Sequence, residues 1–127
     1  MTLEPLMQHV AVEYDNQHKA DLFFGTLLGL PKIKTMVLSQ ELSHAIFGID
    51  TSATIETYGN ERARFEVFVR PKRKKDCTYD HVCLEIADKK EFMTRCEQYG
   101  LKPFSVDRDG KLLWFVRDFA GYLFEIK

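Results

Sequence analysis

The chain has 127 residues, of which 45% are hydrophobic and 13% aromatic, and its 18 Lys and Arg nearly balance its 19 Asp and Glu. This length predicts one domain, and the apolar content excludes intrinsic disorder, collagen and a small disulfide-stapled scaffold. A formal charge of −1 and an isoelectric point near 6.4 lack the basic excess of a dedicated nucleic-acid-binding protein. We therefore expect no nucleic-acid partner.

The sequence also lacks the signals of a membrane or secreted protein. Its longest apolar candidate, residues 22–30, is far shorter than the ~18 residues that span a bilayer. The first eight residues have neither the basic start nor the apolar centre of a secretion signal. The cysteines, Cys77, Cys83 and Cys96, are odd in number and lack zinc-like spacing. These features predict a cytoplasmic protein with reduced thiols and no membrane partner.

An internal repeat organises the chain. Residues 9–13 read His-Val-Ala-Val-Glu and residues 81–85 read His-Val-Cys-Leu-Glu, so both predict a strand that begins at a histidine. A polar start signal and an amphipathic helical pattern follow each strand, and the helices end at Gly29 and Gly100, with a proline soon after.

Three further strands are expected in each half. They are residues 32–39, 42–49 and 62–70 in the first half and 104–107, 111–117 and 123–127 in the second, where Asp109-Gly110 predicts a hairpin turn. A single domain, residues 1–127, would thus contain two βαβββ repeats, 6–70 and 78–127. The basic run Arg70 to Lys75 lies at the linker, residues 71–77, which is either a solvated connector or a rim that attracts an anionic substrate.

Side-chain alternation along the strands assigns four ionisable residues to one face. The wholly apolar set of each strand must pack against the helices, which leaves a common set on the other face, namely His9, Glu66, His81 and Glu125. A solvated face of an antiparallel sheet would give the same alternation. However, the four occupy matching positions in the two repeats, and two imidazoles with two carboxylates suit a divalent first-row metal.

Two segments carry a resemblance to a known family. Residues 20–30, with an aromatic pair followed by Leu-Gly, and residues 118–126, Asp-Phe-Ala-Gly-Tyr-Leu-Phe-Glu-Ile, resemble signatures of the vicinal oxygen chelate superfamily, which includes glyoxalase I, bleomycin-resistance proteins and extradiol dioxygenases. Phe119 and Tyr122 replace the usual Pro and Asn. The resemblance implies an α+β fold in which tandem βαβββ modules form a curved mixed sheet around a cleft, with helices on the outer face. It also implies a homodimer, often with sites built from both subunits.

The resemblance further implies that His9, Glu66, His81 and Glu125 are the ligands of one divalent ion, Zn²⁺, Ni²⁺, Co²⁺ or Mn²⁺. Glyoxalase I uses such a set, whereas extradiol dioxygenases leave the fourth position open, so Glu66 argues against oxygen activation. The implied function is that of a lyase or isomerase acting on a small carbonyl or hemithioacetal-type substrate. The ion would polarise the substrate, and Glu66 or Glu125 would move a proton.

Other functions and other residues stay open. The chain would alternatively be a non-catalytic protein that sequesters a small molecule, as bleomycin-resistance proteins do, or another metal-dependent member: an epimerase, a dioxygenase or a thiol transferase. Glu56 rivals Glu66 as the third ligand. Glu13 and Glu85 share the ligand face and are candidates to orient a ligand histidine. His44, expected to begin a strand, is a candidate pocket residue.

Overall fold

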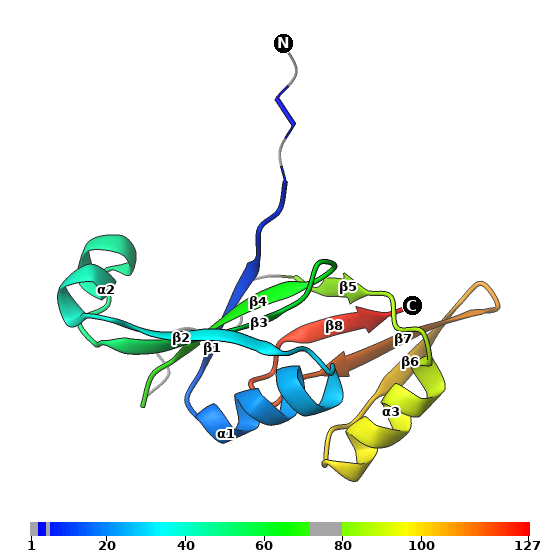
Figure 1. Cartoon of the computed structure of the whole chain (residues 1–127). Coiled ribbons are helices and arrows are strands. Elements are labelled where there is room, and N and C mark those ends of the chain that lie inside the picture. Colours follow the sequence, from blue (N-terminus) through cyan, green and yellow to red (C-terminus); the bar gives the residue numbers. More distant parts are fainter. Residues whose placement is uncertain (1–2, 5, 72–79) are drawn as a thin grey trace.

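A computed structural model describes residues 3–4, 6–71 and 80–127 (Figure 1). The chain forms two four-stranded sheets, called the first and the second sheet in chain order, and helices pack along one side of them (Figure 1). In chain order the elements are β1 (Val10–Tyr14), α1 (Gln17–Ala20), which continues into the π-helix η1 (Asp21–Leu27), β2 (Lys32–Leu38), α2 (Gln40–Phe47), β3 (Ala53–Gly59), β4 (Arg64–Val69), β5 (Val82–Leu84), α3 (Lys89–Gln98), β6 (Phe104–Arg108), β7 (Lys111–Arg117) and β8 (Leu123–Ile126).

The two sheets have the same topology. The strand orders are β1-β4-β3-β2 and β5-β8-β7-β6, and in each sheet the first strand of the module pairs in parallel with the last one. The other pairings are antiparallel, so both sheets are mixed. This confirms the predicted α+β fold with two related modules. Residues 72–77 of the predicted linker lie outside the described residues.

The helix boundaries follow local sequence signals. The side chains of Asn16 and Asp88 each accept a hydrogen bond from the backbone N–H three residues later, which satisfies one of the free donors at a helix start. Gly29 and Gly100, with φ of 71° and 89°, have the left-handed conformation that follows a helix end. Within the described residues, no helix is long and apolar enough to cross a membrane.

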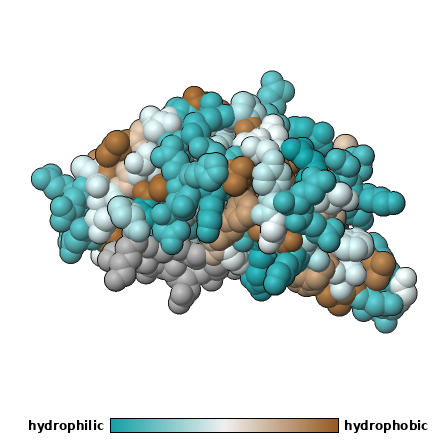
Figure 2. All heavy atoms as spheres, turned by 90° about the horizontal axis from the view of Figure 1, so that it is seen from below, coloured by the Kyte–Doolittle hydropathy of each residue, from teal (hydrophilic) through white to brown (hydrophobic). Residues whose placement is uncertain are grey.

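One aromatic core joins the modules. The ring of Phe24 lies 5.0 Å from that of Phe65 and 5.5 Å from that of Tyr58, both of which belong to the first sheet. The neighbouring Phe23 lies 5.2 Å from Phe124 of the second sheet. Adjacent residues of η1 therefore pack against different sheets. The side of the molecule with α1 and α3 is mainly hydrophilic outside this core (Figure 2).

The strand predicted at residues 42–49 is wrong, because this segment belongs to the helix α2. The Ser39 hydroxyl accepts a hydrogen bond from the Leu42 N–H, and Gly48 ends the helix with φ of 70°. The strand that completes the sheet is β3, which the sequence analysis did not assign. Helix α2 lies at the far end of the first sheet from α3 (Figure 1). It packs Phe47 against Phe68 of β4, on the face opposite η1.

A polar network ties η1 to the first sheet. The Lys32 ammonium binds the carboxylates of both Asp21 and Glu56, and the Tyr58 hydroxyl donates a 2.5 Å hydrogen bond to Asp21. Burial raises the pKa of Tyr58 above its ordinary value, and the hydrogen bond to Asp21 adds to this. Partial burial raises the pKa of Asp21, but hydrogen bonds from Tyr58 and Lys32 outweigh it and the pKa lies below its usual value.

We expect Lys32→Met to destabilise the fold by ~3 kcal/mol, because it leaves the fully buried Glu56 carboxylate without its cation. The measurement is urea denaturation at pH 7. The matched control is Lys34→Met, on the same strand and exposed, which should change the free energy of unfolding by less than ~0.5 kcal/mol. Equal effects of the two substitutions would contradict a role for Lys32 in compensating the buried charge.

Candidate functional site

Strand register places both glutamates on the sheet faces that point away from α1 and α3. In the first sheet, Glu66 pairs with Ala11 of β1 and Thr57 of β3, while the adjacent Phe65 and Val67 belong to the core. In the second sheet, Glu125 pairs with Phe115 of β7. These are the faces that side-chain alternation predicts.

The first module contains one His/Glu pair. His9 Nε2 lies 3.3 Å from Glu66 Oε1. The side chains are 38% and 22% exposed, so both are reachable from solvent. Because β1 and β4 run parallel, a residue at the start of β1 lies beside a residue near the start of β4.

The second module contains a matching pair. His81 Nε2 lies 3.4 Å from Glu125 Oε1, and the side chains are 39% and 16% exposed. On the other side of the ring, Asp80 Oδ1 lies 2.6 Å from Nδ1. The hydrogen bond with Asp80 raises the pKa of His81, a little desolvation opposes this, and the charge of Glu125 adds to it. Asp80 thus holds Nδ1 and leaves Nε2 directed at the carboxylate of Glu125.

The structure brings the four predicted residues together as two pairs. Within the described residues, no group of three or more His, Cys, Asp or Glu side chains is close enough to hold one metal ion. The pair of each module lies on its own sheet. A single chain in this conformation therefore presents two separate His/Glu pairs.

The rival residues lie elsewhere. Glu56 pairs in register with Val67, so it faces the helices, where it is fully buried and bound to Lys32. The strand expected to begin at His44 is wrong: His44 lies in α2, and its Nδ1 is 2.5 Å from Asp50 Oδ1. Glu85 is exposed.

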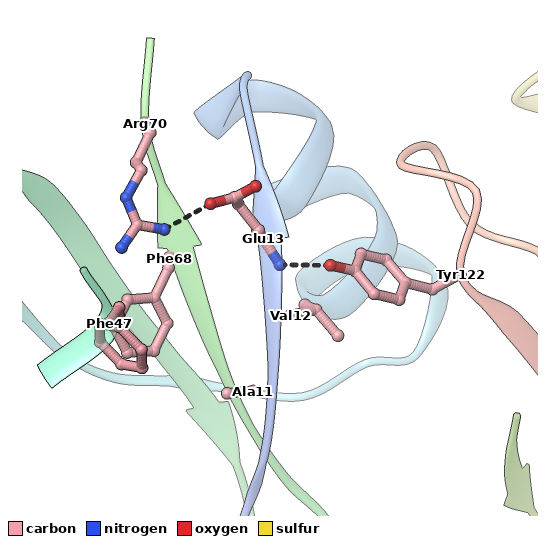
Figure 3. A pocket seen from close by; sticks show the side chains of 7 residues that line it. All are labelled: Ala11, Val12, Glu13, Phe47, Phe68, Arg70 and Tyr122. Carbon is pink, nitrogen blue, oxygen red and sulfur yellow. Dashed lines mark hydrogen bonds and ion pairs between the residues drawn. The ribbon is translucent and has the colours of Figure 1, made fainter. Parts of the chain in front are cut away.

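Glu13 lies in a small pocket that the sequence analysis missed. The cavity of about 80 Å³ is lined by Ala11, Val12, Glu13, Phe47, Phe68, Arg70 and Tyr122 (Figure 3). Arg70 Nη1 lies 2.6 Å from Glu13 Oε2, both side chains are almost completely buried, and the guanidinium lies over the rings of Phe47 and Phe68. The backbone N–H of Glu13 donates a 3.0 Å hydrogen bond to the Tyr122 hydroxyl.

This arrangement separates Arg70 from the rest of the basic run, because Arg70 is buried and paired with Glu13 and so belongs neither to a solvated connector nor to an exposed rim. The signal that identifies it is strand alternation, because Arg70 follows Glu66 and Phe68 at steps of two on the same face. Glu13 follows His9 and Ala11 in the same way on β1. The pocket therefore lies on the face of the first sheet that bears the His9/Glu66 pair.

The pair of the second module borders a larger hollow of about 590 Å³. Leu113 and Phe115 line it together with His81 and Glu125. The hollow also has a charged rim, formed by Arg108, Asp109, Lys111 and Lys127. Its size is that of sites that bind small organic molecules.

Solved structures with the same fold cover almost the whole chain. A glyoxalase family protein from Bacillus cereus is 18% identical, with 99% of this chain and 96% of that chain covered and a TM-score of 0.77. The fosfomycin resistance protein FosX from Listeria monocytogenes is 14% identical, with coverages of 98% and 93% and a TM-score of 0.72. Glyoxalase I from Leishmania major is 19% identical, with coverages of 97% and 86% and a TM-score of 0.69.

Comparison of the amino-acid sequence alone identifies no related protein. No family model matches the chain, and no curated protein does. The structural likeness confirms the resemblance stated from the sequence at the level of the fold: the chain has the glyoxalase-type fold of the vicinal oxygen chelate proteins.

We expect Asp80→Asn to lower the pKa of His81, because the neutral amide no longer favours the protonated imidazole. The measurement is a ¹H–¹⁵N NMR titration of the imidazole without added metal. Asp15→Asn, which removes an exposed carboxylate from the first module, is the control and should leave the His81 titration unchanged. An unchanged His81 titration in Asp80→Asn would contradict the role of this carboxylate.

Proposed function

From the glyoxalase-type fold, we propose that the chain is a metal-dependent lyase or isomerase that acts on a small carbonyl or hemithioacetal-type substrate. One observation carries the proposal: two modules with different sequences present the same two atoms, His Nε2 and Glu Oε1, at 3.3 and 3.4 Å on corresponding strands. Two unrelated surface ion pairs have no physical reason to share strand positions, atoms and partial burial.

The donor set fits a divalent metal ion. Imidazole nitrogens and carboxylate oxygens bind such ions at about 2.0–2.2 Å, so neighbouring ligands of one ion lie roughly 3.0–3.5 Å apart. Both pairs have this spacing before any ion is added. Asp80 on the Nδ1 of His81 has the arrangement that commonly fixes the tautomer and orientation of a ligand histidine. We propose one Zn²⁺, Ni²⁺, Co²⁺ or Mn²⁺ per complete set.

We further propose that a second copy of the chain completes each set. The described residues of one chain supply a half-site on each sheet, and two copies in a homodimer supply two complete sets. Large apolar side chains are exposed along both sheets, as such an interface requires. They include Ile33, Met36 and Val37 of β2, Leu42 and Ile46 of α2, and Phe104, Val106 and Leu112 of β6 and β7.

The chain's residues then have distinct parts in the chemistry. A bound ion supplies a Lewis acid that stabilises negative charge on oxygens of the substrate. His9 and His81 hold the site through Nε2. Glu66 or Glu125 takes a proton from the carbon beside the substrate carbonyl and returns it to the neighbouring position, with Oε2, the oxygen not directed at the histidine, as the proton-carrying atom. The side chains of Glu66 and Glu125 are 22% and 16% exposed, so a substrate bound at the site can reach either carboxylate.

The cellular setting and the partner are part of this proposal. Cys83 and Cys96 are free thiols among the described residues, which suits a reducing cytoplasm. The partner is a small molecule held on the His/Glu faces. A protein that sequesters a small molecule without metal is the competing function, and the following experiment separates the two.

Protein purified without chelating resin should contain about one divalent ion per chain by elemental analysis. His81→Ala and Glu125→Gln should each lower the affinity for the ion at least 10-fold, because each removes a ligand. His18→Ala, an exposed residue of α1, is the control and should keep the ion. Metal-loaded protein should turn over methylglyoxal–thiol hemithioacetals, whereas the two variants should not.

Two results would contradict the proposal. Ion content that persists unchanged in both variants would show that the ion lies elsewhere. Absence of any ion, together with tight binding of a small molecule by metal-free protein, would favour the sequestering function.

A further inference from the structure

The hollow on the second sheet indicates which kind of substrate the proposed site accepts. We infer that the substrate carries an anionic group, such as a carboxylate or phosphonate, and that Arg108, Lys111 and Lys127 bind this group. The inference rests on the proposed function, because it places the anion beside the His81/Glu125 pair. It adds the charge of the substrate and the residues that recognise it.

The three cations lie at one end of the same sheet face. Arg108 ends β6 and pairs in register with Lys111, which begins β7. Lys127 follows Glu125 by two residues, so strand alternation places it on the same face of the second sheet. All three line the hollow that His81 and Glu125 also line. One molecule in the hollow can therefore reach both the cations and the His/Glu pair.

Side chains of the described residues do not neutralise these cations. Within the described part of the chain, none of the three forms an ion pair, in contrast to Lys32 and Arg70. The side-chain carboxylates that line the hollow are those of Asp109 and Glu125, and Glu125 is already directed at His81. An adjoining cavity of about 200 Å³ shares Lys111, Glu125 and Lys127 and adds a further cation, Lys89. The positive charge at this end therefore exceeds the negative charge.

The rest of the hollow suits a substrate with an apolar part. Leu113 and Phe115 are partly exposed on the same face, between the basic end and the other end of the sheet. The corresponding face of the first sheet differs, because Arg70 there is buried and paired with Glu13 (Figure 3). A compensated guanidinium attracts an anion weakly. Lys34 and Arg64 are exposed on this face of the first sheet, but the cations of the second sheet line the same hollow as a His/Glu pair, so the anionic group is expected there.

Benzoate and benzamide form a suitable pair of probes, because they have nearly the same shape and differ in charge. Each is titrated at low salt into metal-free protein, and binding is followed by the ¹H–¹⁵N NMR signals of the second sheet. The double variant Arg108→Gln/Lys111→Gln removes two of the cations. The double variant Lys19→Gln/Lys102→Gln removes two exposed cations that lie outside both His/Glu faces and controls for net charge.

Benzoate should bind the unmodified protein about tenfold more tightly than benzamide, and Arg108→Gln/Lys111→Gln should abolish most of this difference while leaving benzamide unchanged. The control variant should keep the preference for benzoate. Equal binding of the two probes, or equal loss in both variants, would overturn the inference. The test needs neither metal nor turnover, so its failure would leave the metal-content result standing, and the reverse also holds.

Discussion

Phe24 and its neighbour Phe23 form the contact on which the arrangement of the molecule depends. Each ring packs against a different sheet, so one turn of η1 fixes the apolar faces of both modules against a common core. Once the apolar face of a strand is fixed, alternation sends every second side chain to the other face. The outward position of Glu66 and Glu125 is therefore a consequence of core packing, and the two His/Glu pairs are alike because the two packing arrangements are alike.

Core packing and strand alternation separate the charged groups into buried pairs and partly exposed pairs. Glu56 and Arg70 are buried, and each lies against an opposite charge, as burial of a charge requires. His9 and His81 remain partly exposed and lie against carboxylates at metal-ligand spacing. The modules also differ. Helix α2 and the Glu13–Arg70 pair occupy one end of the His/Glu face of the first sheet. The His/Glu face of the second sheet ends at the turn between β6 and β7, where Arg108 and Lys111 form no ion pair with the described residues. The proposed site therefore has one basic end.

Much of the fold follows from local signals in the sequence. The two His-Val starts, the glycines after the helices and the Asp109-Gly110 turn are short-range features, and all correspond to elements of the structure. The segment 42–49 reads as strand-like, but Ser39 and Gly48 are the caps of a helix. The burial of Arg70 depends on Phe47 and Glu13, which are distant in sequence, so a basic run could not reveal it. The separation of the four predicted ligands into two pairs is likewise a tertiary property.

The central claim is that half-sites from two copies form one metal site, and mixing two defective proteins tests it most directly. One variant carries His9→Ala and Glu66→Gln, and the other carries His81→Ala and Glu125→Gln. Neither alone should retain the ion. After 1:1 mixing and statistical subunit exchange, half of the dimers are mixed and each has one intact set, so the account predicts that metal binding, measured by titration calorimetry, returns to about one ion per four chains. Failure of mixed dimers to bind the ion, while the unmodified protein binds it, would contradict the account.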